Sequence, residues 1–419
     1  MTTDDAPDAA VAPATPTKVR GVRGRELVTL SGLGITSLVA YGAWFYAYGV
    51  LVEAIEVDTG WSSSILGATY AAATLLVGVL ATLAGRVLDR RGAAPVLAVG
   101  GVLGGGLLVA ASHATTAGLF ALSYGLGGGL VGALGFYHVT MAASARLGTA
   151  QQRPRNLALL TIWAGLASAI YLPITATLVE AQGWRATQRW LGISVIVAFL
   201  GAAWLTRGLK ARAVEADQDV RPLPALRLAA ADPAVRQMLL AEAVAGIGIG
   251  VLLVQQVPAM VDAGLAFTTA AGFAGARGLL QLAGRIPLTP VVARFGTRRS
   301  LVGALFLVGV SGLLLLNSSN YVIASLFALV AGIGLGAMSP LSGLYAQELF
   351  DDAHLGLLMG ARASVRQVFW AAGPFSAGIL VDATGSTKVA SIMVAIAGFT
   401  SCALLARPLK SPAKLPLPA

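Results

Sequence analysis

Long apolar runs alternate with short polar connectors along almost the whole chain. Each run is about 20 residues long, the length that a helix needs to cross the hydrocarbon core of a bilayer. The connectors between the runs are rich in Arg, Gly or Asp. The pattern predicts twelve membrane-spanning helices, over residues 28–53, 63–86, 94–112, 117–141, 156–180, 187–206, 236–260, 267–290, 300–317, 320–346, 356–381 and 387–406.

The pattern indicates an all-α membrane protein. A segment in lipid must satisfy its own backbone hydrogen bonds, and the strand-length alternation of a membrane barrel does not occur. The most polar internal stretch, residues 207–236, separates the sixth run from the seventh, so we expect two six-helix bundles. The predicted organisation is a disordered cytoplasmic tail (1–26), a first bundle (27–207), a cytoplasmic linker (208–235), a second bundle (236–407) and a second cytoplasmic tail (408–419).

Composition and charge agree with this interpretation. The chain is 56% hydrophobic and only 11% charged, with a mean hydropathy of +0.77, whereas soluble domains carry roughly 25% charged residues. With both termini in the cytoplasm, 22 of the 29 Lys and Arg residues lie in cytoplasmic segments and three in outer connectors. This bias sets the orientation and accounts for the net charge of +10 without nucleic acid as a partner. We expect a monomeric, multi-pass protein of the cytoplasmic membrane, with the lipid bilayer as its surroundings.

The two predicted bundles carry an internal repeat. Val57-Asp58-Thr59-Gly60 precedes the second predicted helix, and Val261-Asp262-Ala263-Gly264 precedes the eighth, at an offset of 204 residues. The ends of the fifth and eleventh helices, residues 178–183 and 380–385, are also alike, at an offset of 202. Two repeated segments at nearly the same offset indicate that the halves are related and pseudo-symmetric.

The connector after the second helix, residues 85–92, reads Gly-Arg-Val-Leu-Asp-Arg-Arg-Gly. It resembles the signature of major facilitator transporters, commonly written G-x-L-a-D-r-x-G-r. The resemblance implies the major facilitator fold and a conformational role for this segment. Gly85 would permit close helix packing, Asp89 can bond the N-terminal amides of a neighbouring helix, and Arg90 would hold the cytoplasmic face.

A weaker copy of the signature lies at residues 289–296, where Arg294 is kept but the first Gly and the Asp are replaced. Two further stretches resemble the branch that holds monocarboxylate transporters and oxalate–formate antiporters. These are residues 257–265 and the pair Gly284-Arg285, where that branch places a substrate-facing arginine. Monocarboxylate carriers usually have an aspartate one turn before this arginine, where this chain has Gln281.

Four arginines lie inside predicted spans of the second bundle, namely Arg277, Arg285, Arg362 and Arg366. An arginine at membrane depth costs at least ~2.5–3.5 kcal/mol on insertion scales, so it needs a function or a partner. Their repeat counterparts are the uncharged residues Ala73, Ala81, Leu160 and Ala164, so the fold itself does not require the charges. On each helix the arginines recur at four- or eight-residue steps and share one face.

These arginines are candidates for binding a small organic anion, because guanidinium groups hold carboxylates bidentately. We assign substrate binding to Arg285, assisted by Arg366, Arg277 and Gln281. Arg362, nearer the cytoplasmic end, is assigned to an inner gate or a headgroup contact. The alternative is that some of these side chains extend to the membrane interface or pair with Glu242.

Two titratable residues are candidates for coupling transport to protons. Glu242 is the acidic residue inside a predicted span, and it can either take up a proton or act as a static counter-ion. His138 can titrate near neutrality or simply bond a neighbour. Gln255 and Gln256 can donate to substrate or bond across helices.

The leading interpretation is a secondary transporter that moves a monocarboxylate-like anion by alternating access, with protons as a further partner. The alternative is a proton-coupled drug exporter, although the fifth helix offers only Pro173 of the exporter pattern G-x-x-x-G-P-x-x-G-G. An enzyme is not expected, since no nucleophile–base pair is visible. No cofactor is expected, and the single cysteine and three scattered histidines predict no metal site.

Overall fold

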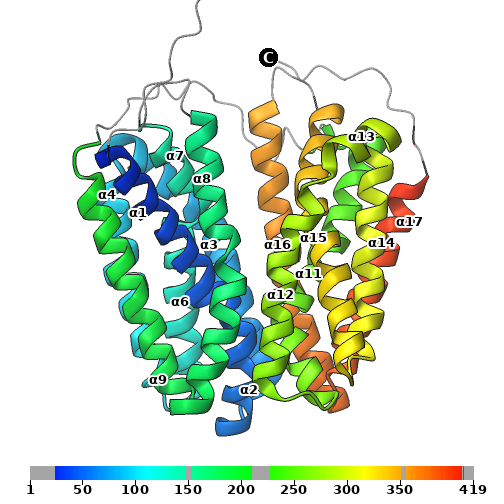
Figure 1. Ribbon diagram of the computed structural model, residues 1–419, viewed down its shortest axis with the longest axis horizontal. Helices are drawn as coiled ribbons and strands as arrows, with labels where there is room; N and C mark the ends of the chain where they lie inside the picture. Colours follow the sequence, from blue (N-terminus) through cyan, green and yellow to red (C-terminus); the bar gives the residue numbers. More distant parts are fainter. Residues whose placement is uncertain are drawn as a thin grey trace, which may run out of the picture.

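The computed structural model describes residues 24–147, 153–209, 227, 229–350, 355–407 and 409. The predicted tails and most of the linker therefore lie outside the described residues. Within them every regular element is a helix, and the helices form two bundles that stand side by side (Figure 1). The all-α architecture of two helical bundles, predicted from the apolar runs, is confirmed.

The first bundle is formed by α1 (Gly24–Ala40), the π-helix η1 (Tyr41–Tyr46), α2 (Tyr48–Thr59), α3 (Ser63–Arg91), α4 (Ala93–Val99), the π-helix η2 (Gly100–Gly105), α5 (Gly106–Ala111), α6 (Ala117–Gly135), α7 (Tyr137–Ser144), α8 (Arg153–Gly165) and α9 (Ala167–Thr206). The second bundle is formed by α11 (Pro233–Asp262), α12 (Phe267–Arg285), α13 (Leu288–Phe295), α14 (Thr297–Leu316), α15 (Tyr321–Leu349), α16 (Leu355–Thr384) and α17 (Lys388–Ala406).

All twelve predicted spans are helical, but several are interrupted. The first runs to Thr59 through η1, and the fifth is divided between α8 and α9. The fifth and sixth meet at Gly183, whose φ of 79° makes a corner inside α9. The eighth ends at Arg285 instead of residue 290, because Pro287 lacks an N–H, and the separate helix α13 begins directly after it at Leu288.

Nine stretches of the described residues are long and apolar enough to cross a membrane, and one of them covers both the fifth and sixth spans. The two predicted spans that fall outside this set are α12 and α16. These are the helices that carry the four arginines. Their lower apolar character is a consequence of polar side chains that face the interior of the molecule, as described below.

The backbone conformation also shows the internal repeat. Six glycines in the described residues have positive φ, and they form three pairs at offsets of 204, 204 and 202 residues: Gly60 with Gly264, Gly92 with Gly296, and Gly183 with Gly385. Only glycine adopts this conformation readily, so each pair marks the same turn in both bundles. The corner contacts repeat as well, since Asp58 accepts from Arg185 at 2.5 Å and Asp262 accepts from the hydroxyl of Thr387 at 2.8 Å.

Both described ends of the chain lie at one end of the bundles, which we call the tail end (Figure 1). At the opposite end, the far end, the two bundles touch backbone to backbone. A Cβ on Gly67 of α3 would stand 2.2 Å from the Pro374 oxygen of α16, and one on Gly378 of α16 would stand 2.3 Å from the backbone oxygen of Ser63 in α3. At the tail end of α3, by contrast, Gly85 has open space. The bundles therefore converge at the far end and separate at the tail end.

Candidate substrate cavity

A cavity lies between the bundles at mid-height. It has a volume of about 250 Å³, and both bundles contribute to its wall. The lining polar and aromatic residues are Tyr41, Tyr46, Tyr137 and Ser168 from the first bundle and Gln281, Arg285, Ser339 and Arg366 from the second. A space that alternate movement of two bundles can open to either end is where a transporter holds its substrate.

A second space of about 170 Å³ adjoins the first toward the far end. The two spaces share Tyr41, Tyr46, Arg285 and Arg366, among others. The second adds Phe45, Arg277 and Trp370 to the wall. The two spaces form one continuous site, which we call the central cavity.

The first bundle presents an aromatic wall. The π-helix η1 occupies residues 41–46 and places Tyr41, Phe45 and Tyr46 on the cavity. The ring of Tyr41 is stacked on Phe136 with 3.9 Å between centroids, which fixes its orientation. One-turn π-helices are frequent at functional sites because they re-aim side chains within a helix.

The second bundle presents a basic wall. Arg285 at the end of α12 is exposed, and Arg366 of α16 is partly buried. No hydrogen bond or ion pair joins either side chain to another residue in the described part of the chain. Both guanidinium groups thus lie at the central cavity without a protein partner in the described residues.

Arg277, two turns from Arg285 on α12, is fully buried, with 0% of its surface exposed. Its Nε donates to Oε1 of Gln256 on α11 at 2.8 Å, but neither terminal nitrogen has a partner among the described residues. Gln256 therefore does not line the cavity itself but holds Arg277, which does. Gln255, also buried, is not among the residues that line the cavity.

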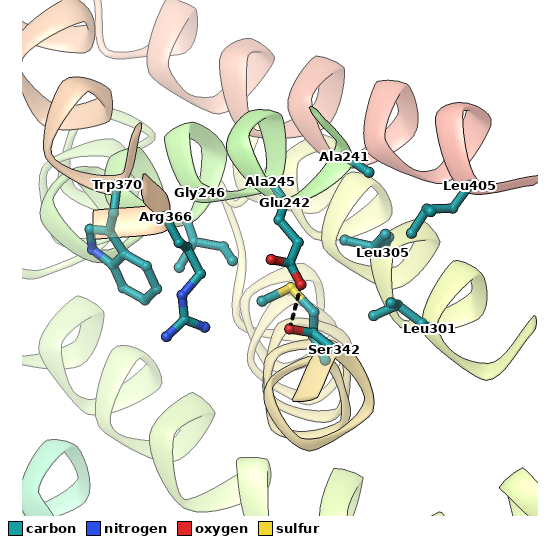
Figure 2. Close-up of a pocket in the computed structure, with 12 residues that line it drawn as sticks. Ala241, Glu242, Ala245, Gly246, Leu301, Leu305, Ser342, Arg366, Trp370 and Leu405 are labelled. Carbon is teal, nitrogen blue, oxygen red and sulfur yellow. Dashed lines mark hydrogen bonds between the residues drawn. The ribbon is translucent and has the colours of Figure 1, made fainter. Parts of the chain in front are cut away.

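Beside the central cavity, Glu242 and Arg362 form a buried ion pair that links α11 to α16. Arg362 Nε donates to Glu242 Oε2 at 2.7 Å, and its Nη2 bonds the other carboxylate oxygen. Ser342 of α15 donates to the same oxygen at 2.8 Å, as Figure 2 shows. The guanidinium of Arg366 extends away from this carboxylate (Figure 2). Arg362 therefore faces neither a headgroup nor the opposite bundle here.

The remaining candidates lie apart from the cavity. His138 is exposed, and its Nε2 bonds the Ala133 carbonyl of its own chain segment at 2.7 Å. Arg90 and Arg294 are exposed at the tail end, where Arg294 lies over the adjacent ring of Phe295.

The signature segment differs from the expectation in two respects. Asp89 accepts from Arg146 of its own bundle at 2.8 Å instead of from the amides of a neighbouring helix. Gly85 has nothing within 4 Å of a Cβ position, so it does not mediate close packing here. The physical reason is the separation of the bundles at the tail end, which brings no helix start from the second bundle to Asp89.

Sequence reasoning missed the aromatic half of the site. Tyr41, Phe45, Tyr46 and Trp370 lie in apolar spans, where such residues usually only pack. The sequence feature that could have indicated this wall is the cluster of aromatic side chains with a polar group in residues 41–48, which include three tyrosines and a tryptophan.

A comparison with protein families decides the identity. The model of the Major Facilitator Superfamily matches residues 33–280 and 238–419. The chain belongs to the major facilitator superfamily. It is therefore a multi-pass membrane transporter and not an enzyme, as predicted. No curated protein matches the sequence significantly.

Solved major facilitator structures share the fold at low sequence identity. The nucleoside transporter NupG matches with a TM-score of 0.74 at 13% identity, covering 91% of this chain and 98% of its own. A bacterial homologue of the human lysosomal transporter Spinster, in an inward-facing and occupied conformation, gives 0.75 at 12% identity, covering 92% and 97%. A D-xylose–proton symporter gives 0.70 at 17%, covering 91% and 96%. These neighbours differ in substrate, so they establish the architecture alone.

Proposed function

We propose that this transporter moves a small organic anion across the membrane by alternating access. The observation that carries the proposal is the convergence of Arg285 and Arg366, from two different helices, on one cavity between the bundles. Neither guanidinium has an ion-pair partner in the described residues. Gln281 lies on the same wall and can add a neutral hydrogen bond to the ligand.

The charge of the cavity favours an anion over the alternatives. Arg277, Arg285 and Arg366 line it, and the nearby carboxylate of Glu242 is already neutralised by Arg362. A cationic drug would bring a fourth positive charge into a site of low dielectric, where like charges repel strongly. A carboxylate would instead accept two parallel N–H bonds from a guanidinium. The resemblance of Gly284-Arg285 to the monocarboxylate branch supports the same substrate class.

The bias of Lys and Arg supports an orientation with the tail end in the cytoplasm and both termini inside the cell. Since the bundles meet at the far end, the structure then corresponds to the inward-facing state of the cycle. We place the proton-coupling step at Glu242, because it lines a small space together with Arg366 and can be freed by movement of Arg362. His138 is exposed and bonds the carbonyl of Ala133, so we do not assign it a role in proton coupling.

Uptake by proteoliposomes tests the proposal. The substitutions are Arg285→Ala and Arg285→Lys, with Arg189→Ala as a control, since Arg189 is exposed and is not among the residues that line the cavity. With labelled pyruvate, succinate and benzoate as probes, we expect uptake of at least one acid by the wild type and the control. Arg285→Ala should reduce it more than tenfold, and Arg285→Lys should retain part of it. Uptake that is equal in all four proteins would contradict the proposal.

A further inference from the structure

The unpartnered guanidinium of Arg277 is the feature that the proposed function leaves unexplained. A small monocarboxylate at Arg285 and Arg366 would not need it. Buried donors without partners are rare, and a buried charge without one is strongly unfavourable. In Arg277 both terminal nitrogens are orphaned, whereas Nε is held by Gln256 at 2.8 Å. The contact with Gln256 orients the guanidinium and leaves its two terminal nitrogens without a hydrogen-bond partner among the described residues.

Arg277 lies at the wall of the central cavity. Arg277 lines the space of about 170 Å³ together with Tyr46, Arg285 and Arg366. The same space is bordered by Trp370, whose Nε1 is also buried without a partner. Every orphaned polar group on this wall is thus a donor, so the ligand that completes it must supply acceptors.

The charge balance leads to the same conclusion. Three arginines line one cavity, and the neighbouring carboxylate of Glu242 is already bonded by Arg362 and Ser342. A monoanion would leave two positive charges uncompensated in a region of low dielectric. A dianion leaves one, and it can reach both ends of the basic wall.

The spacing of the two arginines requires an elongated ligand. Arg277 and Arg285 are eight residues apart on one helix, so their Cα positions differ by about 12 Å along its axis. If each guanidinium holds a carboxylate bidentately, the two carboxylates must lie at opposite ends of the ligand. Between the two arginines the opposite wall is aromatic, with Tyr41, Phe45 and Tyr46 facing the space. A flat, apolar body fits there.

We infer that the substrate is an elongated dianion whose acidic groups lie at opposite ends of a flat body. One acidic group binds Arg277, which Gln256 holds in place, and the other binds Arg285 and Arg366. This inference rests on the proposed transport of an organic anion and specifies the substrate class for the same cavity. It differs from the monocarboxylate expectation, since it assigns a second anion subsite on α12, toward the far end.

Equilibrium binding to the purified full-length protein tests the inference with charge-matched probes. Terephthalate carries carboxylates at opposite ends of a ring, 4-methylbenzoate has the same shape with one carboxylate, and phthalate has two adjacent carboxylates. We expect the wild type to bind terephthalate at least tenfold more tightly than either of the others. In Arg277→Gln the affinity for terephthalate should fall to that for 4-methylbenzoate.

A second variant keeps the test decisive if Arg277→Gln folds poorly. Gln256→Glu is nearly isosteric and places a carboxylate 2.8 Å from Arg277 Nε, so it supplies an internal counter-ion. It should abolish the preference for terephthalate while the protein remains folded. If 4-methylbenzoate binds in a manner that depends on Arg285 but terephthalate has no advantage, the dianion inference is wrong and the proposed function stands. If no acid binds to the wild type, both are wrong.

Discussion

The side-chain carboxylate of Asp382, at the end of α16 in the second bundle, accepts the backbone N–H of Ser63 in the first bundle at 2.8 Å. Its other oxygen accepts the N–H of Ser64 at 2.9 Å. These amides belong to the first turn of helix α3, where free N–H groups and the helix dipole favour a negative charge. The contact joins the bundles at the far end, so it must break when that end opens.

We therefore predict that Asp382→Asn shifts the protein toward the state that is open at the far end. The amide keeps the size of the side chain but loses the charge and one acceptor. In a Cys402→Ala background, Ser168→Cys at the interface between the bundles should react severalfold faster with a membrane-impermeant maleimide added from outside.

The repeat provides a matched control for this experiment. Glu180 is the counterpart of Asp382 in the first bundle, and it is exposed. Glu180→Gln should leave the labelling rate of Ser168→Cys unchanged. Equal acceleration by both substitutions, or by neither, would show that Asp382 does not act as a latch.

Closure at the far end should also depend on Gly67. A Cβ there would stand 2.2 Å from the backbone oxygen of Pro374, which cannot move without shifting α16. Gly67→Ala should hold the bundles apart and lower transport at least tenfold. Gly201→Ala in α9 is the control, because nothing lies within 4 Å of its Cβ position, and it should leave transport unchanged. Similar rates for the two variants would refute the tight closure at Gly67.

The buried pair of Glu242 and Arg362 should matter for stability. Their side chains are only 9% and 7% exposed, and removal of one member of a buried pair typically costs about 3–5 kcal/mol. We expect Arg362→Gln to lower the melting temperature of the detergent-solubilised protein clearly. The double variant Glu242→Gln/Arg362→Gln should recover part of the loss, because neither charge is then left alone. A double variant that is less stable than Arg362→Gln would contradict this explanation.

The proposed coupling role of Glu242 has a separate kinetic consequence. Glu242→Gln cannot take up a proton, so a pH gradient should no longer accelerate uptake of the transported acid. Exchange of labelled for unlabelled acid needs no net proton movement and should persist, which also demonstrates that the variant is folded. If a pH gradient still accelerates uptake fully in Glu242→Gln, Glu242 is not the residue that couples transport to protons.

The arginines could be predicted from the sequence because charge in an apolar run stands out, and the repeat showed that Ala81 and Ala164 occupy the matching positions without charge. The helices were predictable for a similar reason, since lipid leaves the backbone few alternatives. The pairing of Glu242 with Arg362 stayed open, because the rotation of α11 against α16 is fixed only by tertiary packing.

Other features depend on detail that periodicity does not contain. The π-helical register that places Tyr41 and Tyr46 on the cavity cannot be read from a pattern of apolar residues. Asp382 looked like the polar end of a helix, whereas its role depends on the opposite bundle coming within hydrogen-bond distance. The predicted contact of Asp89 with helix amides was not found, because the separation of the bundles at the tail end leaves Arg146 as its partner.

The central claim is that Arg285 and Arg366 make the cavity a site for anions. The most direct measurement is the ligand-induced shift in melting temperature of the purified wild type and the double variant Arg285→Ala/Arg366→Ala, against organic acids, nucleosides, D-xylose and cationic dyes. The account predicts a concentration-dependent rise with one or more acids in the wild type, no rise with the neutral or cationic ligands, and no rise in the double variant. Stabilisation by a nucleoside, by xylose or by a dye but by no acid, or an acid response that survives in the double variant, would contradict it.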